Sequence, residues 1–162
     1  MSANHIISVL VENKAGVLAK ISGLFSRRGF NIESLAVGPT DDESISRITL
    51  VVNAETHSIE QVVKQLYKLI NVLKIQELDP ANIVERELVL VKVSADSNTS
   101  AEILEIANIF RASIVDVAKK SLVIEITGTS RKIEGIEEML RPYGILELVR
   151  TGKIAINRGS KK

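Results

Sequence analysis

The spacing of apolar residues changes along the first 30 residues of the chain. Residues 6–12 are rich in Ile, Val and Leu and lead into the turn-forming run Asn13–Gly16, a pattern typical of a strand and its end. From Val17 onward the apolar positions recur at i, i+1, i+4, i+7 and i+8, which predicts a helix with one buried face. A basic pair followed by Gly29 predicts the end of this helix.

Three more strands and one more helix are predicted before the chain reaches its midpoint. The strands are predicted over residues 30–37, 45–53 and 72–78. Turn-forming residues occupy 38–42, between the first two of these strands. The helix has a capping-box spacing at Ser58–Gln61, and its apolar residues repeat at helical spacing as far as Ile70.

The second half of the chain repeats this order of elements. Its strands are predicted over residues 88–93, 113–117, 122–127 and 145–149. One helix has a capping box at Thr99–Glu102, and the other ends near Pro142 and Gly144. A short extra strand is predicted over 153–156. Because the link between the halves falls near 79–84, we predict one domain over residues 1–80 and a second over residues 81–162.

Each half therefore has the element order βαββαβ. Two strand–helix–strand units of this kind pack two helices on one face of a four-stranded antiparallel sheet. The predicted fold class is α+β, with two ferredoxin-like βαββαβ domains in tandem.

The composition narrows the function. With 162 residues, 45% hydrophobic and 25% charged, the chain resembles an ordinary globular protein, and its formal net charge of +1 gives no argument for nucleic-acid or membrane binding. The absence of cysteine removes disulfides, thiolate metal sites and cysteine nucleophiles. Neither a secretory signal nor an apolar run of the roughly 20 residues needed to cross a bilayer is found, so we expect a cytoplasmic protein or its organellar equivalent.

No familiar catalytic or metal-binding motif is present in the sequence. His5 and His57 each lack a nearby cysteine or second histidine, which favours an ordinary strand-end or surface position. The carboxylates at 41–43 could hold a cation, but no supporting ligand pattern surrounds them, which favours a solvated turn. We therefore predict no catalytic residue and no metal site.

The segment Asn13–Leu18 is the most informative one for binding. It joins a strand end to a helix start, where unpaired amides and the helix dipole favour an anion. Gly16 would let the backbone come close to a ligand such as the carboxylate of a free amino acid, and Asn13 could bind either polar end of it. Asn31 and Ile32 offer a second polar group and an apolar wall. The alternative of an ordinary strand end, turn and helix stop stays open on these residues.

Two long blocks of sequence carry a family resemblance. Val11–Leu18 and Gly23–Leu35 together closely resemble the opening of acetolactate (acetohydroxyacid) synthase regulatory subunits. In that family this opening is an ACT domain, a ferredoxin-like module that binds small effectors, often amino acids; the second half is then an ACT-like domain. Shorter likenesses at Arg86–Leu88 and Val149–Ala155 extend the resemblance over essentially the whole chain.

The resemblance implies a non-catalytic regulatory subunit that activates a separate catalytic subunit and confers feedback inhibition by valine, or by leucine or isoleucine. Two ACT domains would pair side by side, which suits a sheet edge that needs a partner, and the amino acid would bind at their interface. One wall of that site would consist of Asn13, Lys14, Ala15, Gly16, Val17 and Leu18. The opposing side would carry Asn31 and Ile32.

The implied partners are the catalytic subunit of acetolactate synthase, a second copy of this chain and the amino-acid effector. Thiamine diphosphate, FAD and Mg are expected in the catalytic partner, with no cofactor in this chain, and the second domain is expected to help in dimerisation and regulation. The chain departs from the family at Ala15, where many members carry proline, which stiffens the turn. Ala19 likewise lacks the hydroxyl that a serine gives some relatives.

Two other classes of protein share this fold. A small enzyme, such as a mutase or an acyl-group binder, would need convergent acid, base or nucleophile residues, which the pattern lacks. An RNA-binding ferredoxin-like protein would carry exposed aromatic residues on its sheet, whereas the central strand candidate Ile48–Val52 has none.

Overall fold

The computed structural model describes residues 3–159, apart from the side chains of Ala3, Thr56 and His57, so the question raised about His57 lies outside the described residues. The chain forms two compact units. Residues up to Val84, together with those from Lys153 onward, make up the first unit, and Glu85–Gly152 make up the second. The contacts thus divide the chain differently from the predicted ranges 1–80 and 81–162, because the C-terminal segment returns to the first unit.

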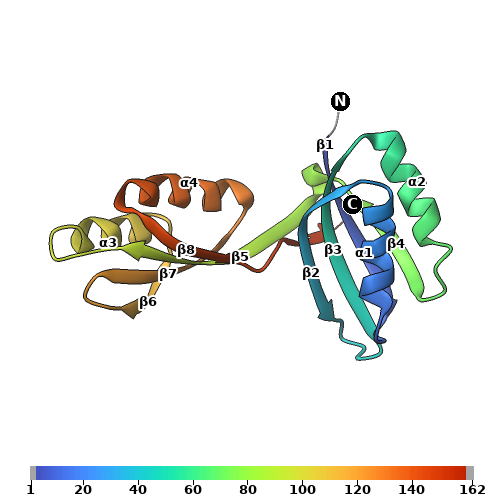
Figure 1. Cartoon of the computed structure of the whole chain (residues 1–162), viewed down its shortest axis with the longest axis horizontal. Helices are drawn as coiled ribbons and strands as arrows, with labels where there is room; N and C mark the ends of the chain where they lie inside the picture. The colour runs from blue at the N-terminus through green and yellow to red at the C-terminus, as the bar shows by residue number, and fades with distance from the viewer. Residues whose placement is uncertain (1–2, 160–162) are drawn as a thin grey trace. The chain divides into compact units, whose positions relative to one another are not determined.

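The first unit is a four-stranded antiparallel sheet with two helices on one face (Figure 1). Its strands are β1 (Ala3–Glu12), β2 (Asn31–Pro39), β3 (Ile45–Ala54) and β4 (Val72–Leu78), in the order β2-β3-β1-β4. Its helices are α1 (Val17–Arg27) and α2 (Thr56–Leu66). This is the predicted ferredoxin-like arrangement.

The second unit repeats the arrangement. Its strands and helices are β5 (Ile83–Ser94), α3 (Ser100–Ile109), β6 (Ser113–Val117), β7 (Ser121–Gly128), α4 (Ser130–Leu140) and β8 (Ile145–Arg150). The strand order is β6-β7-β5-β8, equivalent to that of the first sheet. Short 3-10 helices occupy Pro80–Asn82 and Arg141–Tyr143, and β9 (Ile154–Asn157), the predicted extra strand, pairs with β5.

Aliphatic side chains fill the space between the first sheet and its helices. Because side chains alternate along a strand, Ile7, Val9 and Val11 of β1 all point toward the helices and are buried. The buried face of α1 contains four of the five predicted positions and ends with Phe25, whereas Leu18, also predicted on this face, is 40% exposed. The rings of Phe25 and Phe30 meet edge to face with centroids 6.2 Å apart. The apolar spacing therefore predicted both β1 and α1, the strand and the helix that pack together here.

A smaller apolar cluster lies on the other face of the first sheet. It consists of Ile6, Val51, Leu78, Ile83 and Ala155. The side chains of β1, β3 and β4 in this cluster alternate with those of the main core, and β9 covers them with a buried alanine. This packing explains why the C-terminal segment belongs to the first unit.

The predicted start and end of α2 were wrong. The helix begins at Thr56, and the amides of Ser58 and Ile59 both donate to the carbonyl of Glu55 at 3.1 Å, so Ser58 lies inside the first turn and does not cap it. The helix ends at Leu66, and Ile70 lies in the following turn with 87% of its surface exposed. An apolar residue at helical spacing is therefore not part of the core here.

The predicted capping box of α3 has the right position but the wrong chemistry. Thr99 precedes the helix without capping it through its side chain. The carboxylate of Asp96 instead accepts from the amides of Asn98 at 2.8 Å and Thr99 at 3.1 Å. Helix α4 does have a side-chain cap, because Thr129 accepts from the amide of Lys132 at 3.4 Å. No helix within residues 3–159 is long and apolar enough to cross a membrane.

Two isoleucines provide a matched test of this core. Ile21 in α1 is fully buried, whereas Ile70 is almost fully exposed. We expect Ile21→Ala to lower the free energy of unfolding by about 2–5 kcal/mol, because it removes buried methyl groups and leaves a cavity. Ile70→Ala should change it by less than about 0.5 kcal/mol. Urea denaturation followed by circular dichroism measures both, and equal losses would contradict the assignment of the core.

Candidate functional site

The turn between β1 and α1 is fixed to the ends of both neighbouring strands. The amide of Glu12 donates to the carbonyl of Asn71 at 2.9 Å, and the amide of Asn13 donates to the carbonyl of Ser44 at 2.8 Å. The amide of Lys14 then turns back to the carbonyl of Glu12 at 2.9 Å. These bonds place the turn at the end of the sheet where β1 ends and β3 and β4 begin.

Gly16 gives the turn its shape. It precedes α1 with φ of 86° and ψ of −11°, in the left-handed region. An L residue with a side chain is disfavoured there by about 1–2 kcal/mol. A Cβ atom at this position would meet no atom within 4 Å, so the requirement for glycine comes from the backbone and not from crowding.

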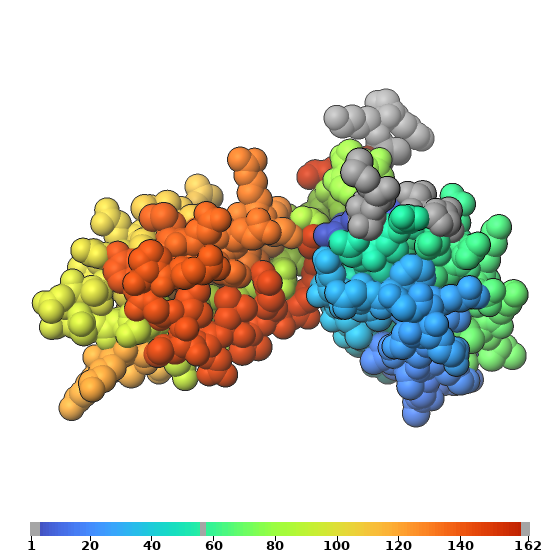
Figure 2. Space-filling view, turned by 45° about the horizontal axis from the view of Figure 1, so that its top comes forward, coloured from blue at the N-terminus to red at the C-terminus, as the bar shows by residue number. Residues whose placement is uncertain are grey.

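Helix α1 begins without a side-chain cap. Within the described residues, no acceptor is bonded to the amides of Ala15, Gly16, Leu18 and Ala19, and the amide of Val17 makes only a long bond of 3.4 Å to the carbonyl of Lys14. The first regular helical bond is donated by the amide of Lys20 to the carbonyl of Gly16. In the space-filling view the turn and the start of α1, in deep blue, lie at the surface of the first unit (Figure 2). These exposed donors at the positive end of a helix dipole suit a carboxylate.

The side chain of Asn13 is partly committed. Its Nδ2 donates to the carbonyl of Glu43 in the β2–β3 hairpin at 2.9 Å. An asparagine amide has two N–H groups and a carbonyl oxygen, so Oδ1 and one N–H are left for a ligand. Asn13 can therefore both hold the hairpin against the turn and accept a hydrogen bond from an ammonium group.

The carboxylate cluster at 41–43 serves the hairpin itself. One oxygen of Asp42 accepts from the amide of Ser44 at 2.9 Å and from its hydroxyl at 2.6 Å. These bonds hold the pKa of Asp42 below its ordinary value. In the part of the chain that the structure describes, no group of three or more His, Cys, Asp or Glu side chains could hold a metal ion.

A polar network beside the turn was missed by the sequence-based prediction. The carboxylate of Glu12 lies 2.8 Å from Nζ of Lys14 and accepts from Nδ2 of Asn71 at 3.3 Å, and both interactions lower the pKa of Glu12, with Lys14 the larger cause. Nζ of Lys20 reaches Oδ1 of Asn71 at 3.5 Å. The acid next to the turn is thus paired with a lysine, which reduces its repulsion of an anionic ligand on the free amides. Asn71 is 59 residues from Glu12, and no local pattern indicated it.

The apolar residues of the turn do not all face outward. The side chain of Val17 is only 4% exposed and packs in the core, so Val17 can offer a ligand its backbone but not its side chain. Leu18 is 40% exposed and is the apolar side chain that this wall can present. Lys14 and Ala15 are exposed as well.

Asn31 and Ile32 lie at the other end of the sheet. Asn31 begins β2 opposite Asn53, which itself pairs with Asn4 near the start of β1, whereas the turn follows the end of β1 (Figure 1). Ten residues of strand at ~3.3 Å each separate the two positions by about 30 Å. The structure therefore does not bring the two predicted walls together within one chain.

The two edges of the first sheet differ in their exposed backbone. On β4, the hydroxyl of Tyr67 accepts from the amide of Ile75 at 3.1 Å and donates to its carbonyl at 3.2 Å, so the backbone groups in the middle of this edge are occupied. On β2, no strand in the described residues pairs with the outward side. An unpaired strand edge is a template for another strand, and β2 is the edge that is open to one.

Comparisons with known proteins agree over the whole chain. The family model described as AHAS small subunit-like ACT domain matches residues 7–74, and that for the small subunit of acetolactate synthase matches residues 86–159. The acetolactate synthase small subunit of Mycolicibacterium smegmatis is 54% identical over 97% of this chain and 92% of its own length. A probable acetolactate synthase small subunit of Archaeoglobus fulgidus is 53% identical over 98% and 99%. The crystal structure of the acetolactate synthase small subunit from Thermotoga maritima superposes with a TM-score of 0.91, at 42% identity, covering 98% of this chain and 99% of that one.

A pair of glycines tests the backbone of the turn. Gly16 and Gly23 both have free space where a Cβ would stand, but only Gly16 has a positive φ. We expect Gly16→Ala to destabilise the protein by about 1–2 kcal/mol. Gly23→Ala, inside α1, should stabilise it by about 0.5–1 kcal/mol. Chemical denaturation of the two variants gives the sign of each change, and a stabilising Gly16→Ala would contradict the left-handed turn.

Proposed function

The chain belongs to the family of acetolactate synthase small subunits, and we propose that it controls a separate catalytic subunit in response to a branched-chain amino acid, with valine as the first candidate. In this proposal the chain activates the catalytic subunit, and the bound amino acid converts activation into feedback inhibition. The chain itself is non-catalytic, and thiamine diphosphate, FAD and Mg reside in the catalytic partner. The proposal also locates this assembly in the cytoplasm.

The observation that carries the proposal is the uncapped start of α1. The carboxylate of the effector would accept hydrogen bonds from the free amides between Ala15 and Ala19, where the helix dipole favours negative charge. Its ammonium group would donate to Oδ1 of Asn13, the oxygen that the hairpin leaves unused. Its branched side chain would lie against Leu18. The turn thus offers a free α-amino acid one partner for each of its three parts.

A second chain completes the site in this proposal. If two first units pair through β2 about a two-fold axis, the two β2 strands run antiparallel, so the start of one lies beside the end of the other. This operation brings Asn31 and Ile32 of one chain toward the end of the partner's sheet that holds the Asn13–Leu18 turn. The occupied edge at β4 and the open edge at β2 support this choice of interface. The dimer would then hold two equivalent sites.

Regulation requires the effector to prefer one state of the complex. An effector that binds both states equally shifts nothing, whatever its affinity. A site shared between two chains meets this requirement, because a change in the pairing of the chains changes the site. The expected specificity is modest, since one methylene in an apolar pocket is worth roughly 1–3 kcal/mol, so leucine and isoleucine should compete with valine.

Variants of the turn test the effector site directly. We expect Asn13→Ala to remove the partner of the ammonium group, and Gly16→Asp to put a negative charge where the carboxylate binds. Both should abolish inhibition of the reconstituted enzyme by valine, while the complex still forms acetolactate. Asn108→Ala, at an exposed position of α3, is the control and should be inhibited like the wild type. Full inhibition of both turn variants would refute the site.

Mixed dimers test the contribution of the second chain. Asn13→Ala and Asn31→Ala should each weaken valine binding at both sites of a homodimer. In a heterodimer of the two variants, one site carries both substitutions and the other carries neither. Calorimetric titration of the heterodimer should therefore find one valine bound per dimer with wild-type affinity. A heterodimer in which no site recovers would place both walls in the same chain.

A further inference from the structure

Strand β2 contains a bulge next to the predicted effector wall. Ile32 is opposite Val52, but Ser34 is opposite Val51, so Glu33 is an extra residue without a partner. The bulge breaks the alternation of the strand. Ile32 packs toward the helices, while Ser34 faces the other side of the sheet. The position of Asn31 and Ile32 therefore depends on how this bulge is held.

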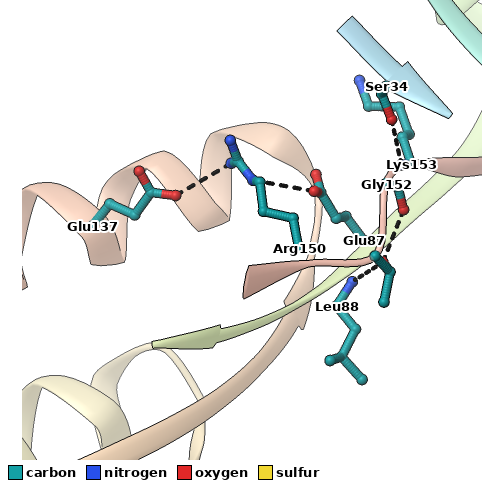
Figure 3. Close-up of polar contacts among 8 residues, drawn as sticks. Ser34, Glu87, Leu88, Glu137, Arg150, Gly152 and Lys153 are labelled. Atoms are coloured by element: carbon teal, nitrogen blue, oxygen red, sulfur yellow. Dashed lines mark hydrogen bonds and ion pairs between the residues drawn. The ribbon is translucent and has the colours of Figure 1, made fainter. Parts of the chain in front are cut away.

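The bulge is held by the C-terminal segment. Oγ of Ser34, partly buried, accepts from the backbone amide of Lys153 at 2.8 Å (Figure 3). Two residues later Ala155 of β9 is buried in the apolar cluster on the same face of the sheet. Ser34, two residues after Ile32 of the predicted wall, thus fixes the point at which the chain re-enters the first unit.

The residues just before Lys153 are anchored in the second unit. The amide of Thr151 donates to the carbonyl of Leu88 at 3.0 Å, and its hydroxyl oxygen accepts from the amide of Leu88 at 3.1 Å. The same hydroxyl donates to the carbonyl of Gly152 at 2.9 Å, and Gly152 has φ of 88°. Gly152, in a conformation that favours glycine, is thus the single residue between Thr151, which is bonded to the second unit, and Lys153, which is bonded to the first.

Arg150 strengthens the anchor on the second unit. Its Nε lies 3.1 Å from the carboxylate of Glu87 on β5, and its Nη2 lies 3.2 Å from that of Glu137 on α4 (Figure 3). The side chains of both acids are largely buried. One guanidinium group thus ties three elements of the second unit together next to the crossover Arg150–Lys153.

We propose that Ser34 is a positioning residue that couples the effector wall to the crossover Arg150–Lys153, and that inhibition depends on this coupling. The inference rests on the proposed function. An effector that displaces Asn31 and Ile32 also displaces Ser34, and the hydrogen bond to Lys153 passes this displacement to a segment held in the second unit by Thr151 and Arg150. Lys153 is bonded to Ser34 within the first unit and Thr151 to Leu88 within the second, with Gly152 between them.

The test separates binding from inhibition. Ser34→Ala removes the acceptor and keeps the strand, so the isolated chain should bind valine in calorimetry with a Kd within about threefold of the wild type. Effectors commonly change an equilibrium by about 5–150-fold. In the reconstituted enzyme, Ser34→Ala should reduce the inhibition at saturating valine by about fivefold or more, while activation without valine is kept. Ser34→Thr, which retains a hydroxyl on a strand, should restore inhibition.

Two further variants complete the test. Ser100→Ala removes a hydroxyl that donates to the carbonyl of Asp96 in the second unit and should be inhibited normally. Ser34→Cys keeps the volume but offers only a weak sulfur acceptor, so it replaces Ser34→Ala if that variant does not fold.

The outcomes distinguish this inference from the proposed function. A wild-type chain that neither binds nor responds to valine, leucine or isoleucine refutes the proposed function and this inference with it. Normal inhibition of Ser34→Ala overturns only the coupling. Complete loss of valine binding in Ser34→Ala also overturns it, because Ser34 would then belong to the binding wall. A threonine variant that behaves like the alanine variant excludes the hydroxyl as the cause.

Discussion

The free amides at the start of α1 are the feature on which the proposed effector site depends. A side-chain cap at such a position commonly stabilises a helix by about 1 kcal/mol. Here Gly16 occupies the capping position in a left-handed conformation and offers no side chain, so that stabilisation is absent and the amides from Ala15 to Ala19 keep their hydrogen-bonding capacity. The loss is small compared with the burial of the aliphatic core. The fold can therefore leave one helix end unsatisfied and keep it for a ligand.

The second unit shows what the same position looks like when it is filled. In the turn between β5 and α3, the carboxylate of Asp96 accepts from the amides of Asn98 and Thr99, and its carbonyl accepts from the amide and hydroxyl of Ser100. The chain's own acid thus occupies the kind of donor site that an effector's carboxylate would occupy in the first unit. The two halves share their topology but differ at this turn, because the acceptors of Asp96 take up amides before α3 whereas the amides at the start of α1 remain free.

Local patterns predicted the order of the elements and the turn, but not the bounds of α2 or the contacts that connect distant segments. The apolar spacing of α1, the turn at Gly16 and the end of β4 all follow from residues within one or two turns of each other. The capping box at Ser58 misled because its spacing also fits the interior of a helix whose first turn forms on the carbonyl of Glu55. The contacts of Asn71 with Glu12 and of Lys153 with Ser34 were not predictable, because each joins residues far apart in sequence through the register of the strands.

The distance of about 30 Å between the turn and the start of β2 makes pairing of two chains a condition for binding, in the proposed arrangement. An effector that needs both chains binds the pair and not the separated protomers, so its binding free energy also favours association. In that arrangement the wall from the second chain carries the bulge at Glu33, and Ser34 ties the bulge to Lys153, where the chain returns from the second unit. Binding, association and the state of the second unit then depend on the same short stretch of β2. In the proposed arrangement a small ligand influences a large complex through this stretch, because Ser34 joins the effector wall by a hydrogen bond to the segment where the chain re-enters the first unit.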